Sequence, residues 1–90
     1  MELYDVTVWD KSLSEKPDEW TMESPPVRVK ATDSYEAARQ VAKRAGITEL
    51  KGIPRPPENL TGMFFESPGL DLVFQSEDTG IIKPKRVSFY

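Results

Sequence analysis

The stretch from Val27 to Gly46 constrains the fold more than any other part of the chain, because three kinds of signal agree there. Its first five residues alternate apolar and basic side chains, which is the period-two pattern of a half-buried strand. Asp33 follows, and Glu36 stands three positions further on, as in a capping box at a helix N-terminus. The stretch therefore predicts a strand that leads directly into a helix over about 33–45.

The predicted helix is amphipathic, and one of its faces is made mostly of alanine. At helical spacing the apolar side chains share one arc, formed by Ala37, Ala38, Val41, Ala42 and Ala45. The other arc is polar and basic and carries Glu36, Arg39, Gln40, Lys43 and Arg44, with Tyr35 at its border. Because alanine buries little apolar area, the larger groups of the core must come from the sheet under this helix.

The sequence also predicts strands at 3–9, 63–66, 70–75 and 81–90. In the first of these, Tyr4, Val6 and Val8 share one face, which we expect to pack on the helix. Trp9 then lies on the opposite face of the sheet or at its edge. Pro84 interrupts the last segment, so that strand is split, bulged or at the sheet edge.

Two long connections separate these strands within a single domain that spans residues 1–90. A polar loop is expected at 10–26, where prolines and acidic residues are frequent, and a Pro/Gly-rich connection at 46–62. A shorter turn is expected at 76–80. Trp20 lies within the first connection, and three alternatives are open for it: it covers an edge of the core, it is an exposed anchor for a partner, or it belongs to a disordered loop.

The predicted element order is β–β–α–(β)–β–β, which favours a two-layer α+β domain. It has a mainly antiparallel sheet of four to five strands, with the one amphipathic helix on one face. A single helix leaves the other face solvated, covered by the long loops or buried against a partner. We expect an uncovered face that includes Trp9 and either Phe64 or Phe65, and this face is the strongest candidate for an interaction surface.

The composition excludes several kinds of catalytic site. The chain has no cysteine and no histidine, which rules out disulfides, thiol chemistry, zinc sites built on those residues and Ser-His-Asp triads. The candidate carboxylates have no neighbouring nucleophile and no metal-ligand spacing: Asp18 and Glu19 in the polar loop, Asp71 in a strand, and Glu77 and Asp78 in a turn. We therefore expect no enzyme activity, no metal and no cofactor.

The favoured hypothesis is a small non-enzymatic protein-binding module, an inhibitor or accessory factor, acting through the uncovered sheet face and the 10–26 loop. The protein partner has no predicted identity, and a homodimer is a simpler alternative. The candidate partner-binding residues are Trp9, Trp20, Tyr35, Arg39, Lys43 and Arg44.

Two other functions are kept as alternatives. The basic helix face, with Arg39, Lys43 and Arg44, suggests weak nucleic-acid binding, although the net charge of −3 does not favour it. The acidic stretch Glu15–Glu23 suggests a phage-type inhibitor that imitates nucleic acid. The N-terminal sequence lacks the pattern of a signal peptide, and no apolar run is long enough to span a membrane, so we expect a cytoplasmic protein without a membrane partner.

Overall fold

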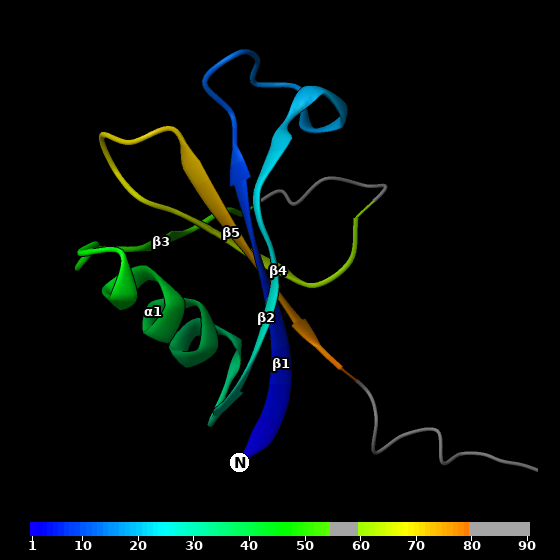
Figure 1. The fold of residues 1–90 in the computed structure, drawn as a ribbon, viewed down its shortest axis with the longest axis vertical. Coiled ribbons are helices and arrows are strands. Elements are labelled where there is room, and N and C mark those ends of the chain that lie inside the picture. The colour runs from blue at the N-terminus through cyan, green and yellow to red at the C-terminus, as the bar shows by residue number, and fades with distance from the viewer. Residues whose placement is uncertain (55–59, 80–90) are drawn as a thin grey trace, which may run out of the picture.

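The computed structural model describes residues 1–54 and 60–79, which form an antiparallel sheet with an α-helix packed against it (Figure 1). The elements in chain order are β1 (Glu2–Asp10), a 3-10 helix (Pro17–Glu19), β2 (Thr21–Ala31), α1 (Ser34–Arg44), β3 (Lys51–Gly52), β4 (Met63–Glu66) and β5 (Leu72–Asp78). The strands are arranged in the order β2-β1-β5-β4-β3. The predicted α+β class is confirmed, while the strand expected at 81–90 lies outside the described residues.

The helix forms where its end signals predict it. Asp33 is the N-cap, and its Oδ1 accepts the backbone N–H of Glu36 at 2.8 Å. Beyond the C-terminus, Gly46 has a φ of 81°, in the left-handed region that favours glycine. The buried face of α1 consists of Ala37, Ala38, Val41 and Ala42. Ala45 was expected on the same face, but it is exposed because it follows the last turn.

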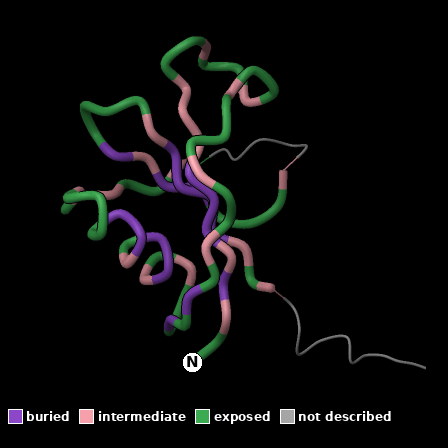
Figure 2. The backbone as a smooth tube through the Cα atoms, in the orientation of Figure 1, coloured by how far each residue is buried: buried purple, intermediate pink, exposed green. Residues whose placement is uncertain are grey.

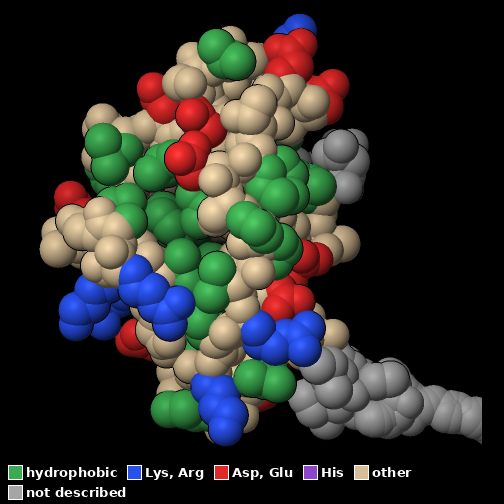
Figure 3. Space-filling model, in the orientation of Figure 1, with side chains coloured by type: hydrophobic (Ala, Val, Ile, Leu, Met, Phe, Trp, Pro, Cys, Tyr) green, Lys and Arg blue, Asp and Glu red, His purple; other side chains and the backbone are tan. Residues whose placement is uncertain are grey.

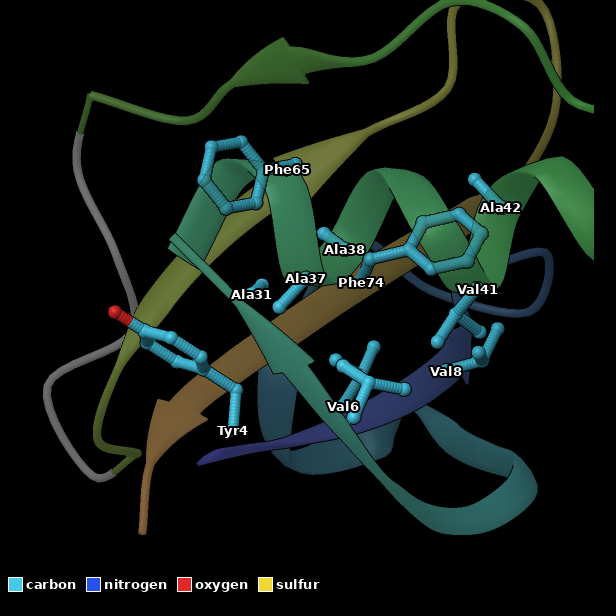
Figure 4. Packing of buried hydrophobic residues seen from close by; sticks show 11 residues of the cluster. Tyr4, Val6, Val8, Ala31, Ala37, Ala38, Val41, Ala42, Phe65 and Phe74 are labelled. Carbon is cyan, nitrogen blue, oxygen red and sulfur yellow. The ribbon is translucent and has the colours of Figure 1, made fainter. Parts of the chain in front are cut away.

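The core lies between α1 and the sheet, as Figure 2 shows by the buried inner side of the helix and the buried central strands. Tyr4, Val6 and Val8 face the helix, as their alternation predicts. Larger side chains from β4 and β5, Phe65 and Phe74, fill the space above the alanines (Figure 4). The alanine face therefore allows the helix to approach closely, and the sheet supplies the bulk.

The connection expected at 10–26 is shorter than predicted, because β2 already begins at Thr21. Trp9 pairs with Met22, and the register shifts twice before the regular pairing with β1 resumes at Val27. Pro25 and Pro26 are tolerated inside β2 because β2 is an edge strand, where a missing N–H on the outer side removes no hydrogen bond to another strand. The bulges in the pairing with β1 also accommodate the extra residues of β2. The prolines were wrongly interpreted as part of a loop.

The free edge of β2 is also contacted by the helix. Gln40 Nε2 donates to the backbone carbonyl of Lys30 at 2.8 Å, which ties α1 to the edge strand. Across the paired edge of β2, Arg28 Nε donates to Asp5 Oδ1 of β1 at 2.9 Å. Both contacts lie in the half of β2 that leads into the helix.

The second half of the chain also differs from its prediction at two places. The short strand β3 lies inside the connection expected at 46–62 and pairs with β4, where Gly52 is opposite Phe65. β5 begins two residues after the start of the strand expected at 70–75 and continues to Asp78, so residues 76–78 of the expected turn at 76–80 belong to the strand. Ser76 lies within this extension and is buried, because it pairs with Val6 of β1 on one side and Met63 of β4 on the other.

The face of the sheet opposite the helix is covered over β4 and β5, so the expected uncovered face is wrong for this region. Strand alternation places Phe64 on that face and Phe65 on the helix side. The Phe64 side chain is only 2% exposed, and Val73 and Gln75 beside it are also buried. The amide of Gln75 donates to the carbonyl of Thr61 at 2.7 Å, which holds the segment before β4 to the sheet. Among the described residues, the segment before β4 rather than a second helix therefore lies against this side.

Candidate functional site: a groove at the end of the helix

The helix is much shorter than the hairpin on which it packs. Eleven residues of helix α1 extend about 16 Å, whereas the eleven residues of β2 extend about 36 Å. The helix starts near Ala31, which pairs with Glu2 at the beginning of β1. It therefore covers that end of the sheet and stops before the other, where the β1–β2 hairpin continues past it (Figure 1).

A groove remains where the helix stops, with a volume of about 400 Å³. We call it the helix-end groove. Most of its lining is apolar and comes from three strands and the last turn of α1: Val8, Glu23, Ser24, Val27, Val41, Arg44, Ala45, Leu72 and Phe74. Figure 3 shows the hollow as a cluster of hydrophobic side chains, with acidic side chains above it and basic side chains below.

Irregular strand geometry helps to keep this groove open. Val6 pairs with Val27 and Val8 pairs with Ser24, so that β2 contains one more residue than β1 in this interval. A bulge of this kind bends the strand and increases its twist. Ser24 is small, and it stands opposite Val8 where a larger side chain would fill part of the groove.

Two opposite charges mark the rim of the groove. Glu23 comes from β2 and Arg44 from the last turn of α1, and both are exposed. Within residues 1–54 and 60–79, neither side chain has a salt-bridge partner, whereas Arg28, Arg39 and Lys11 each do. The groove therefore combines an apolar floor with an available carboxylate and an available guanidinium.

The four candidate residues predicted on the helix do not lie together in one site. Tyr35 is exposed at the first turn, and its ring contacts Phe65 edge-on, with the centroids 5.6 Å apart. Arg39 pairs with Glu36 at 3.4 Å. Lys43 is exposed and, with Arg39, borders a shallow depression outside the helix-end groove. Arg44 alone among these four lies in the groove lining.

The two tryptophans lie elsewhere. Trp9 is half-buried on the sheet face opposite the helix, and its Nε1 donates to Gln75 Oε1 at 2.9 Å. Trp20 is also half-buried and lines a second cavity that includes Val73 of β5. The structure thus places neither tryptophan beside Arg44, and the six predicted residues do not form one site.

The sequence interpretation missed most of the groove. Strand periodicity puts Leu72 and Phe74 on one face of their strand, and the structure shows that this face packs on the helix-side core, as Val27 does. The signal that could have revealed the groove is the difference in length between a helix of about three turns and the strands beneath it. Glu23 was noticed only as part of an acidic stretch, because its position depends on the bulged pairing of β2.

The described residues contain no cluster of three or more acidic side chains that could hold a metal ion, and no helix among them could cross a membrane. The volume of the groove is at the small end of ligand pockets, which span about 300–1,000 Å³. It can accept one or two aliphatic side chains. The chain matches no protein-family model, no curated protein and no solved structure.

Proposed function

We propose that this chain is a small non-enzymatic protein-binding module, an inhibitor or accessory factor, that contacts its partner through the helix-end groove. The observation that carries the proposal is the apolar groove left beyond the last turn of α1, lined by Val8, Leu72 and Phe74. Hydrophobic recesses with a polar rim are typical of the central part of protein interfaces.

The groove is not the interaction surface expected from the sequence, which was the sheet face opposite the helix. The groove lies on the helix side of the sheet, beyond Ala45, whereas the opposite face is buried over β4 and β5. Glu23 and Ser24 belong to the stretch first assigned to the 10–26 loop and supply one wall. The partner best suited to this surface inserts an aliphatic side chain and places an acidic group near Arg44.

The test is to block the groove without disturbing the core. Ala45 is exposed at the C-cap, so Ala45→Phe fills the mouth of the groove while the buried alanines stay unchanged. Thr48→Phe adds the same ring at an exposed position outside the groove lining and is the matched control. Each variant is used to capture proteins from a lysate of the encoding organism, and the captured partner is quantified by mass spectrometry.

We expect the partner to be captured by the unmodified chain and by Thr48→Phe, and to be lost with Ala45→Phe. Arg44→Glu should also weaken capture, because it reverses one charge of the rim. Equal capture of the same partner by Ala45→Phe and by the unmodified chain would exclude the groove as the binding surface.

Weak nucleic-acid binding through Arg39, Lys43 and Arg44 is the alternative, and it has less support. Arg39 is paired with Glu36, and Arg44 turns to the groove rather than extending a basic surface. Titration with single- and double-stranded oligonucleotides at about 50 mM salt separates the two functions, because phosphate contacts are strong at low ionic strength. Binding there that fades with added salt would favour this alternative.

A further inference from the structure

A second cavity lies on the opposite face of the sheet and is independent of the helix-end groove. Its volume is about 320 Å³, and we call it the Trp20 cavity. The tip of the β1–β2 hairpin forms one wall, and β4, β5 and the residue after β3 form the other: Lys11, Glu15, Pro17, Trp20, Ile53, Glu66 and Val73.

Trp20, which lines this cavity, has an unusual indole nitrogen. Trp20 Nε1 is buried and has no hydrogen-bond acceptor among the described residues. The other tryptophan behaves differently, because Trp9 Nε1 donates to Gln75 Oε1 at 2.9 Å. A buried indole N–H normally has a partner, since leaving it unpaired is unfavourable. A group that enters the cavity with an oxygen acceptor would satisfy this donor.

The remaining lining limits the chemistry of such a group. Pro17, Ile53 and Val73 supply aliphatic surface. Lys11 is already engaged by Glu15, with 3.4 Å between its Nζ and Oε1, and its side chain is only 17% exposed. Glu66 is half-buried and has no ion-pair partner in the described part of the chain.

One lysine against two glutamates gives the lining a net charge of −1. A free carboxylate is therefore a poor occupant, although it could accept from Trp20. A neutral carbonyl next to a cation matches the lining better, because the carbonyl accepts from Trp20 Nε1 and the cation pairs with Glu66. Peptide backbone next to a lysine or arginine side chain supplies both groups.

We propose that the Trp20 cavity binds a short peptide segment of a partner protein that contains an aliphatic residue followed by a basic one. A backbone carbonyl of the segment accepts from Trp20 Nε1. The aliphatic side chain packs on Ile53 and Val73, and the basic side chain pairs with Glu66. This site does not depend on the helix-end groove, and each can fail without the other.

Nuclear magnetic resonance of the ¹⁵N-labelled chain tests this directly, because the chain has two tryptophans and so two indole N–H signals. Trp9→Phe assigns the two signals. The probe is N-acetyl-Leu-Lys-amide at millimolar concentration, and N-acetyl-Leu-Glu-amide is the matched control. We expect the Trp20 signal to move downfield with saturation while the Trp9 signal stays in place. The control peptide should bind about twofold to fivefold more weakly, as expected for loss of one exposed ion pair.

Two variants identify the contacts. Glu66→Gln should remove the preference for the lysine peptide while the Trp20 signal still responds to both peptides. Ala45→Phe should leave the response unchanged, which separates this site from the proposed function. The proposal is overturned if the Trp20 signal does not move with the lysine peptide, whether or not its proton exchanges rapidly with solvent. It is also overturned if the unmodified chain binds both peptides with equal affinity.

Discussion

Trp9 and Gln75 form a hydrogen bond across neighbouring strands on the sheet face opposite the helix. Trp9 Nε1 donates to Gln75 Oε1 at 2.9 Å, and Gln75 Nε2 in turn donates to the carbonyl of Thr61 at 2.7 Å. The Gln75 side chain is 5% exposed, so these bonds replace contacts with water. One buried amide therefore connects β1, β5 and the segment that leads into β4.

We expect Gln75→Leu to lower the free energy of unfolding by about 1–3 kcal/mol, because it leaves the Trp9 N–H and the Thr61 carbonyl without this partner. Urea unfolding followed by circular dichroism measures the change. The double variant Trp9→Phe/Gln75→Leu should cost less than the sum of the single variants, since both ends of the bond are then removed. Strictly additive costs would show that the bond is not formed.

Phe64 and Phe65 are neighbours in β4 that point to opposite faces, and both are buried. We expect Phe64→Ala and Phe65→Ala each to cost about 3–5 kcal/mol of unfolding free energy, through lost burial and the cavity left behind. Met63→Ala in the same strand is the control, because Met63 is 55% exposed and its loss should cost at most about 0.5 kcal/mol. A cost for Phe64→Ala close to that of Met63→Ala would show that the second face is open.

The N-cap of α1 gives a third prediction. Asp33→Ala should lower the free energy of unfolding by about 1 kcal/mol, because the backbone N–H of Glu36 loses its acceptor. Asp33→Ser retains an oxygen acceptor and should recover most of this loss. Urea unfolding of the three proteins checks the order, and an Asp33→Ser variant as unstable as Asp33→Ala would contradict the capping role.

Tyr4 should make stability depend on pH in the alkaline range. Burial raises the pKa of its phenol above the ordinary value of 10.0, and the negative charges of Glu2, Asp78 and Asp33 add to the effect. The unfolded chain therefore loses this proton first, so the contribution of Tyr4 is complete below about pH 10 and declines as the pH rises through 10 toward the folded pKa.

The measurement compares unfolding free energies of the unmodified chain and Tyr4→Phe at pH 8 and pH 11. The unmodified chain should lose more stability between these values, because phenylalanine has no proton to release. Parallel losses in both proteins would mean that the phenol of Tyr4 has the same pKa in the folded and unfolded states.

Local signals in the sequence predicted the helix well. The Asp33 cap and the glycine at position 46 act within a few residues, so their effect can be read directly from the chain. The order of the strands could not be read in this way, because β1 lies between β2 and β5, and β5 is more than sixty residues away in sequence. Such pairing depends on the global arrangement rather than on local propensity.

The two surfaces proposed as binding sites were harder to predict than the fold. The helix-end groove results from a short helix on long strands and from the register shift near Ser24. The Trp20 cavity forms because the hairpin tip reaches Ile53, which is distant in sequence. The sequence led us to expect that Trp20 covers an edge of the core or anchors a partner, but its unpaired N–H is visible only in three dimensions.

The outer edge of β2 is partly protected against pairing with another strand. An added strand would need backbone hydrogen bonds along this edge, yet Pro25 and Pro26 have no N–H, and the Lys30 carbonyl is already taken by Gln40. Pairing through backbone hydrogen bonds depends little on the sequence of the added strand, whereas a side-chain pocket distinguishes between partner sequences. Strand addition is therefore disfavoured along this part of β2, addition of a second copy of the chain included.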